Sequence, residues 1–248
     1  MTSNRTYISN ISRVPFEKLS FRKLPHILHH TDLPSSVDLR PKMPPVRDQS
    51  SLGACSSFAL IAGFEYDDPS FQGSHLFLYY NERVIENDVE IDGGAFLSDG
   101  ILALQKYGLC SEATWPYDIS KFVEKPPESA YTEALNHQAL EVKNIHQDIN
   151  SMKNSLVNGF PFVVGIQLFQ EFESEHVAKT GIVPMPTRLS KSIGGHAVII
   201  VAYTPEHWIA QNSWSSDWGD HGFFYLPYAY LLDSSLCSDL WSILKVEK

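Results

Sequence analysis

The chain has 248 residues, of which 43% are hydrophobic and 19% are charged. This composition is typical of a globular protein with room for one domain or two, and it excludes a largely disordered chain. The formal net charge of −10, with no basic run longer than a pair, argues against nucleic acid or an anionic membrane surface as a partner. The sequence has no apolar run long enough for a membrane helix and no apolar signal-peptide core at its start.

Three cysteines, Cys55, Cys110 and Cys237, provide neither a disulfide framework nor a metal quartet. Because the number is odd, at least one thiol has no bridge within the chain, which fits the cytoplasm or another reducing intracellular compartment. Secretion by another route stays open. The sequence gives no reason to expect a cofactor or a metal, and it does not indicate an oligomeric state.

Residues 1–32 form a short polar and basic arm that contains His26, His29 and His30. Since no cysteine or carboxylate completes this cluster at ligand spacing, we interpret it as solvated surface rather than a metal site. Two interpretations of the arm stay open. It lies in or near a cleft like a pro-segment and limits access until it is displaced or cut, or it is a disordered tail.

An extended lead-in follows from residue 33, and Pro41, Pro44 and Pro45 disfavour a helix before residue 50. The apolar run that starts at Cys55 predicts a helix buried in the core, which ends near residue 67. Ser50 and Ser51 are its candidate caps.

The later elements change from helical to β along the chain. Further helices are predicted at 74–87, 96–107 and 148–159, and β-branched runs at 162–166 and 197–201 predict buried strands. The predicted fold is therefore α+β, with a mainly helical subdomain at about 42–137, a mainly β subdomain at about 138–248 and a cleft between them.

Cys55 is a candidate nucleophile. A thiolate at a helix start is favoured by the peptide dipoles, and a protonated histidine beside it lowers the thiol pKa into the range of roughly 3.5–7.5. We therefore expect an accessible thiol with a lowered pKa. The alternative for a cysteine at this position is a small buried apolar residue.

His196 and Asn212 are candidate partners of this thiol. His196 follows Gly194 and Gly195, which leave room for a substrate, and precedes a predicted strand. The side-chain oxygen of Asn212 would accept the other ring N–H of the histidine, and Trp214 would shield that bond from water. The alternatives are a core histidine and a turn asparagine.

Gln49, six residues before Cys55, offers side-chain N–H groups that could bind an oxyanion together with the backbone N–H of Cys55. Alone it would be interpreted as an exposed loop residue. Together with the thiol, the imidazole and the orienting amide, it indicates a thiol hydrolase.

These motifs resemble the papain-like cysteine peptidases. The resemblance covers most of residues 33–248, and it rests on the sequences listed here: Gln49 through Phe58, Asp92-Gly93-Gly94, Trp115-Pro116-Tyr117, Gly195-His196-Ala197, and Asn212-Ser213-Trp214 through Trp218-Gly219. It implies a papain-like fold with a helical left subdomain and a β-barrel-like right subdomain, with the active site in the cleft between them. It also implies Cys55 as nucleophile, His196 as general acid/base, Asn212 as its orienting partner and Gln49 as oxyanion donor.

The chain departs from the family pattern at several positions. Leu52 and Ile91 stand where the family usually has a disulfide, so we expect an apolar packing contact in its place, as in short bacterial or viral members. Ser56 replaces the usual aromatic residue after the nucleophile, which predicts a more open wall beside the thiol. Gly195 replaces a residue that often has a side chain, so the family's pH behaviour need not apply.

The resemblance implies that a polypeptide substrate contacts three places: the loop after Asp92, the two glycines before His196, and the indole of Trp214. The predicted substrate-binding residues are Gly93, Gly94, Ala95, Phe96, Gly194, Gly195 and Trp214. The predicted function is that of an endopeptidase that forms an acyl-thioester. Acyl transfer by the same site and a catalytically silent binding module are the alternatives.

Overall fold

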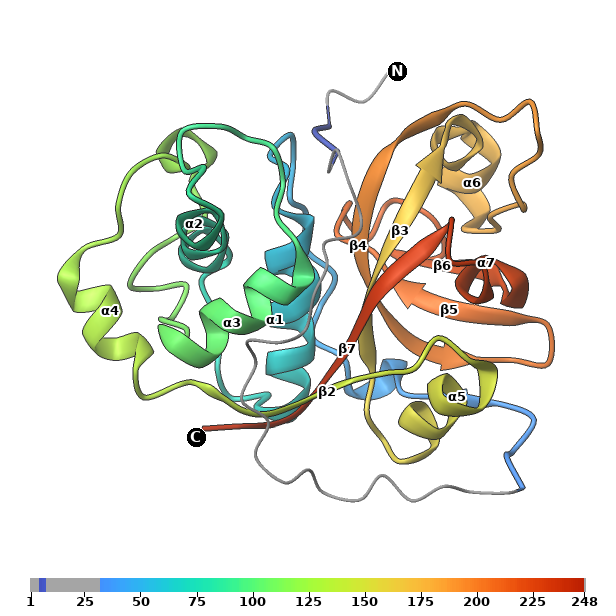
Figure 1. Ribbon diagram of the computed structural model, residues 1–248, viewed down its shortest axis with the longest axis horizontal. Helices are drawn as coiled ribbons and strands as arrows, with labels where there is room; N and C mark the ends of the chain where they lie inside the picture. The colour runs from blue at the N-terminus through green and yellow to red at the C-terminus, as the bar shows by residue number, and fades with distance from the viewer. Residues whose placement is uncertain (1–4, 8–31, 248) are drawn as a thin grey trace.

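In the computed structural model, residues 5–7 and 32–247 are described, and His26, His29 and His30 of the arm lie outside these residues. Two halves lie side by side: a group of helices on the left of Figure 1, and an antiparallel sheet with shorter helices on the right. The prediction of an α+β fold is confirmed.

The helical half of the molecule is built from consecutive elements of the first part of the chain. Its α-helices are α1 (Cys55–Asp67), α2 (His75–Glu86), α3 (Leu97–Lys106) and α4 (Glu128–Ala134), with a short 3-10 turn at Ile119–Lys121. A further 3-10 turn at Arg40–Lys42 lies beside the sheet of the other half, where Arg40 contacts the ring of Phe223. The helices predicted at 74–87 and 96–107 correspond to α2 and α3.

The other half is an antiparallel sheet with the order β2-β7-β3-β4-β5-β6, in which β1 also pairs with β4. Its strands are β1 (Val37–Asp38), β2 (Ala139–Asn144), β3 (Phe162–Phe169), β4 (Ser192–Tyr203), β5 (His207–Gln211), β6 (Phe223–Pro227) and β7 (Cys237–Val246). Around it lie α5 (Ile149–Val157), a 3-10 turn at Gln170–Glu173, α6 (Glu175–Thr180) and α7 (Tyr228–Leu232). The predicted helix and strands at 148–159, 162–166 and 197–201 correspond to α5, β3 and β4.

The start of α1 differs from the prediction in one respect. The helix begins at Cys55, but its N-cap is Ala54, which makes no side-chain capping hydrogen bond. Ser50, a predicted cap, has a φ of 57° and belongs to the preceding turn. The candidate caps Ser50 and Ser51 are therefore wrong, because the loop turns once more before the helix starts.

Strand β4 connects the two cores of the molecule. Side chains alternate between the faces of a strand, so Ala197 and Ile199 pack in the cluster that contains α1, while Val198 and Ile200 pack in the cluster on the other side of the sheet. Burial on both faces explains why the sequence of β4 is almost continuously apolar. His196 is in phase with Val198 and shares its side of the strand.

The part of the chain that the structure describes contains no helix long and apolar enough to cross a membrane. Nor do the described residues bring together three histidine, cysteine or acidic side chains that could hold a metal ion.

Candidate active site

The thiol of Cys55 lies against strand β4. Cys55 is the first residue of α1, and the backbone N–H of Ala197 donates a hydrogen bond of 3.4 Å to its Sγ. Ala197 directly follows His196 in β4, where His196 pairs with Ile166 of β3. The packing of α1 on the sheet thus brings the cysteine to the residue beside the histidine. The prediction that His196 precedes the strand is wrong, because β4 begins at Ser192.

His196 and Asn212 form a hydrogen-bonded pair. The distance between Nε2 of His196 and Oδ1 of Asn212 is 2.8 Å. The backbone of Asn212 is fixed as well, since its N–H donates to the carbonyl of Gly222 over 2.9 Å. Gly222 has a φ of 86°, and a Cβ there would lie 2.5 Å from a methyl of Val46, so only glycine fits beside the asparagine.

The indole of Trp214 covers this pair, as the sequence predicts. Its ring centroid lies 5.0 Å from that of His196 with an interplanar angle of 35°, and Trp214 is only 2% exposed. Phe172 packs edge-on against Trp214 with ring centroids 5.3 Å apart. A hydrogen bond in such dry surroundings is stronger than one in water, so the indole favours a fixed imidazole.

Gln49 is held by contacts at several of its atoms. Its Nε2 donates to the carbonyl of Leu52 over 2.9 Å, and its Oε1 accepts from Ser213 Oγ over 2.5 Å. Its backbone N–H donates to the carbonyl of Ser213 over 2.9 Å. An amide nitrogen has two N–H groups, so one donor of Gln49 remains for a ligand. Gln49 is buried, so the alternative interpretation as an exposed loop residue is wrong.

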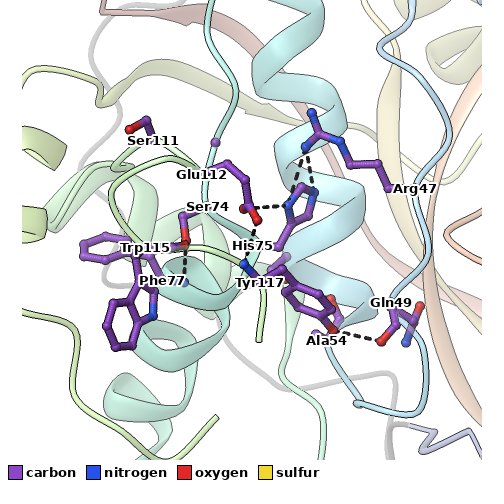
Figure 2. Close-up of polar contacts among 12 residues, drawn as sticks. Arg47, Gln49, Ala54, Ser74, His75, Phe77, Ser111, Glu112, Trp115 and Tyr117 are labelled. Carbon is purple, nitrogen blue, oxygen red and sulfur yellow. Dashed lines mark hydrogen bonds and ion pairs between the residues drawn. The ribbon is translucent and has the colours of Figure 1, made fainter. Parts of the chain in front are cut away.

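A buried polar network lies behind Gln49, on the side of α2. The hydroxyl of Tyr117 donates to the backbone carbonyl of Gln49 over 2.8 Å, and the backbone N–H of Tyr117 donates to Glu112 over 2.6 Å. Figure 2 shows that the ring of His75 lies between Glu112 and Arg47.

Burial, more than the charges around it, explains the protonation state of His75. A guanidinium nitrogen of Arg47 lies 3.2 Å from Nε2 of His75, and Arg47 also makes hydrogen bonds of 3.0 and 3.1 Å to Glu65. Burial, assisted by the charge of Arg47 and opposed by Glu112, lowers the pKa of His75 to about 4. The imidazole is therefore neutral at pH 7, and this network supports the loop that contains Gln49.

A second polar group ties the loop before Cys55 to the Gly93-Gly94 loop. The carboxylate of Asp92 accepts from the backbone N–H of Gly53 over 2.9 Å and from the hydroxyl of Tyr79 over 2.6 Å. The same hydroxyl accepts from the backbone N–H of Gly94 over 3.2 Å. We call Asp92 and Tyr79, with these contacts, the Asp92 tether.

The Asp92 tether corrects one expectation from the sequence. Leu52 is buried, but Ile91 is 60% exposed, so it is not the partner in a buried apolar contact. Charge-assisted hydrogen bonds connect the two loops instead.

The expectation for Ser56 is also wrong. Ser56 is fully buried, and its hydroxyl donates a hydrogen bond of 2.6 Å to Glu82. It therefore forms part of the core and not of an open wall beside the thiol.

The predicted substrate-binding residues lie on both sides of the thiol. Gly94 lies beside Gly53, since a Cβ at Gly53 would come within 3.2 Å of the Gly94 nitrogen, and a Cβ at Gly93 would make only ordinary contacts, 3.9 Å from Ile91 and 4.0 Å from Asp88. Ala95 is buried, and Phe96 is half-buried at the N-terminus of α3. On the opposite side, Gly194 and Gly195 directly precede His196 in β4 and pair with β3, and the Gly194 carbonyl accepts from Gln167 over 2.8 Å.

Cys55 and His196 are both buried, which differs from the accessible thiol expected from the sequence. Cys55 and His196 are each 1% exposed. Burial raises the pKa of the Cys55 thiol to about 12. Burial, together with the nearby charge of Arg5 and opposed by the hydrogen bond to Asn212, lowers the pKa of His196 to about 4. The expectation of an accessible thiol with a lowered pKa is thus wrong for this structure, in which both groups are neutral.

Arm residues 5–7 lie over this site. Figure 1 shows them in dark blue between the two halves. The backbone N–H of Thr6 donates to the carbonyl of Ser51 over 3.3 Å, and the guanidinium carbon of Arg5 lies 4.3 Å from the centre of the Trp214 ring. The segment therefore touches the loop that precedes the cysteine and the indole that covers the histidine.

Residues 33–231 match a family described as papain family cysteine protease. The chain belongs to this family. It is a papain-like cysteine peptidase, and the structure has the papain-like arrangement of helices and antiparallel sheet.

Among known proteins, this papain-like chain is 40% identical over 215 residues to an uncharacterized peptidase C1-like protein of Acanthamoeba polyphaga mimivirus, covering 80% of this chain and 69% of the relative. It is 28% identical over 206 residues to a viral cathepsin of Adoxophyes honmai nucleopolyhedrovirus, covering 79% of this chain and 57% of the relative. A crystal structure of xylellain, a cysteine protease from Xylella fastidiosa, matches with a TM-score of 0.83 and 34% identity, and covers 97% of this chain and 96% of that one.

The three cysteines of this papain-like peptidase, Cys55, Cys110 and Cys237, are all free and buried. The predicted resemblance to bacterial and viral members without the usual disulfide is confirmed by these relatives and thiols.

Sequence reasoning did not identify several residues that support the site. Asp92 and Tyr117 stood in recognised motifs but had no assigned role, and Tyr79 was predicted only as part of a helix. Ser213 was included in the Asn-Ser-Trp motif, without a role for its hydroxyl. The Asp92 carboxylate that contacts Gly53 lies 39 positions further along the chain, so no local sequence pattern indicates this contact.

Proposed function

We propose that Cys55, His196, Asn212 and Gln49 are the catalytic residues of a peptidase that cleaves within polypeptide chains. The observation that carries this proposal is the hydrogen bond between His196 and Asn212 next to the Cys55 sulfur. Asn212 engages Nε2, so Nδ1 is the ring nitrogen available to exchange a proton with the thiol.

In the proposed reaction, His196 takes the thiol proton and the Cys55 sulfur attacks the scissile carbonyl. The free N–H of the Gln49 amide and the backbone N–H of Cys55 bind the resulting oxyanion. His196 then protonates the leaving amine, and an acyl-thioester remains on Cys55. His196 next activates a water molecule, which hydrolyses the thioester and restores the thiol.

Cleavage of a peptide library by the wild-type chain and by Cys55→Ala tests this proposal. We expect internal cuts by the wild type and none by the variant. A thiol-directed epoxide probe should label Cys55 alone, although Cys110 and Cys237 are also free. Cleavage by Cys55→Ala, or wild-type chain that is active but unlabelled at Cys55, would contradict the assignment.

We also propose that residues 1–32 act as an inhibitory arm on a peptidase domain at 33–248, divided into a mainly helical part at about 42–137 and a mainly β part at about 138–248. The contacts of Arg5, Thr6 and Tyr7 support this role, as does the burial of both reacting groups. The raised thiol pKa and the lowered imidazole pKa both oppose formation of the reactive ion pair.

Deletion of residues 1–32 should raise turnover of a small peptide, and Arg5→Ala/Tyr7→Ala in the full chain should do so in part. Unchanged turnover in both would reject an inhibitory role.

Because the three thiols are free, we further propose that the peptidase works in a reducing compartment.

A further inference from the structure

Arm residues 5–7 contact the site in the manner of an extended peptide. Thr6 faces the loop before Cys55, where its methyl would lie 3.2 Å from a Cβ at Gly53. The neighbours of Thr6 turn to the opposite wall: Arg5 lies over Trp214, and the ring of Tyr7 meets Trp214 edge-on with centroids 6.3 Å apart. Alternation of this kind is the geometry of an extended segment, which is also how a peptidase of this kind would bind its substrate.

Glu173 provides the polar end of this contact. The hydroxyl of Tyr7 donates a hydrogen bond to its carboxylate. Glu173 directly follows Phe172, which is 1% exposed and packs against both Trp214 and Trp218. The buried ring of Phe172 fixes the backbone of its neighbour, so the Glu173 carboxylate is held at the rim of the indole.

The chemistry of this rim favours side chains that are cationic or that donate hydrogen bonds. An aromatic face attracts a guanidinium, and a carboxylate accepts strong hydrogen bonds from charged or phenolic donors. Two further glutamates flank Glu173 but have other partners: Glu171 accepts from Ser190 over 2.5 Å, and Glu175 pairs with Lys179 at 2.6 Å. Glu173 is therefore the carboxylate of this group that meets the arm.

The position of the indole indicates which side of the cut it serves. The leaving amine must receive its proton from His196, and Trp214 packs on the His196 ring. The residues that follow the scissile bond therefore pass along Trp214, whereas Gly94 borders the other side of the thiol loop.

We propose that Trp214 and Glu173 form a subsite that selects an arginine and a tyrosine, two residues apart, in the segment downstream of the cut. Trp214 takes the guanidinium, and Glu173 accepts a hydrogen bond from the phenol. The substrate class is thus a polypeptide with an Arg-x-Tyr segment after the scissile bond, which the arm copies through Arg5 and Tyr7. This inference rests on the proposed peptidase function.

The test uses the full chain with Arg5→Ala/Tyr7→Phe, so that the arm no longer competes with the substrate through these side chains. Four quenched fluorescent peptides share one sequence before the cut and have Arg-Thr-Tyr, Ala-Thr-Tyr, Arg-Thr-Phe or Ala-Thr-Phe after it. Each triplet is placed at the first or the second position after the cut. We expect kcat/KM to be about 3- to 30-fold higher with arginine than with alanine in the better register.

Glu173→Gln in that background should abolish the preference for tyrosine over phenylalanine. The matched control is Glu175→Gln, which removes a carboxylate two residues away that is 82% exposed and paired with Lys179, and it should retain both preferences. Equal kcat/KM for all four peptides, or equal effects of the two glutamine variants, would overturn the proposal.

A binding measurement separates this inference from the reaction itself. Cys55→Ala in the same background should bind a fluorescent Arg-Thr-Tyr peptide more tightly than an Ala-Thr-Phe peptide, as measured by anisotropy. If no peptide is cleaved but this difference persists and depends on Glu173, the subsite is retained and the peptidase proposal fails. If the peptides are cleaved without any difference in rate or binding, the subsite fails alone.

Discussion

The carboxylate of Asp92 holds the backbone N–H of Gly53, with distances of 2.9 and 3.2 Å from its two oxygens. This contact joins the loop that ends at the nucleophile to the loop that contains Gly93 and Gly94. A Cβ at Gly53 would lie 2.9 Å from the same carboxylate, so the close approach requires glycine. The two loops that flank the thiol are thus fixed to each other by a polar contact rather than a covalent one.

Removal of the Asp92 tether should impair binding of extended substrates. Asp92→Ala leaves the Gly53 N–H and the Tyr79 hydroxyl without their acceptor, which costs about 1–3 kcal/mol in the free energy of unfolding. Because small misplacements at a site are costly, we expect kcat/KM for extended peptides to fall about 10-fold. Alkylation of Cys55 by a small reagent should change much less.

The control for the Asp92 tether is Asp118→Ala. Asp118 also accepts a backbone hydrogen bond, from Ser120 over 3.0 Å, but it lies on the surface. An equal loss of peptide cleavage in both variants, or an equal loss of alkylation and cleavage in Asp92→Ala, would contradict a positioning role.

Ser213 should act through Gln49. Its hydroxyl donates to Oε1 of Gln49, which orients the amide nitrogen toward the site. Gln49→Ala should lower kcat by roughly 10²–10³, the usual effect of losing an oxyanion donor. Ser213→Ala should lower kcat less, by about 10-fold, with little change in KM. The double variant should match Gln49→Ala, whereas additive losses in steady-state kinetics would argue for separate roles.

His75 should make the fold sensitive to acid. Its pKa is lowered to about 4 in the folded protein from an ordinary value of 6.5. The unfolded chain therefore binds more protons between these values, and stability is present above pH 6.5 and is lost as the pH falls toward 4. The loss from this one group is at most about 3 kcal/mol.

Denaturant unfolding between pH 7 and pH 4 measures this dependence. His75→Gln should lower stability at pH 7 but reduce the slope with pH, because the titrating group is gone. His176→Gln, on the exposed side of α6, serves as a control and should leave the slope unchanged. An unchanged slope in His75→Gln would show that another group governs the acid transition.

The charge of Arg5 should lower the reactivity of the Cys55 thiol. The guanidinium is one of the causes that lower the pKa of His196, so Arg5→Ala should raise that pKa and favour the imidazolium. The labelling rate of Cys55 by an epoxide probe should then increase between pH 6 and 7.5, by roughly 10-fold for each pKa unit regained. Arg5→Lys keeps the charge and should remain near the wild-type profile; identical profiles for all three chains would exclude this effect.

Local sequence patterns were sufficient for six elements, namely α1, α2, α3, α5, β3 and β4, but not for the remaining strands and short helices. The catalytic roles of Cys55, His196, Asn212 and Gln49 stay a prediction. The apolar run after Cys55 has helical character, and β4 reads as a strand because Val198, Ile199 and Ile200 are β-branched residues suited to a buried sheet. The caps of α1 could not be predicted, since the turn at Ser50 depends on a hydrogen bond from its N–H to Asp48 and on pairing of Asp48 with Trp214.

The sequence by itself determined the main helices and strands and the order of the Gln, Cys, His and Asn motifs along the chain, because helix and strand periodicity and each short motif are properties of neighbouring residues. Only the tertiary structure decided that the thiol and the imidazole are buried and neutral, that Asp92 joins the two loops, and that Arg5 and Tyr7 lie on Trp214. Burial, desolvation and contacts between distant segments depend on how α1 packs on the sheet and where the arm lies. No local pattern encodes these relations, and they set the charge state and the access that govern the reaction.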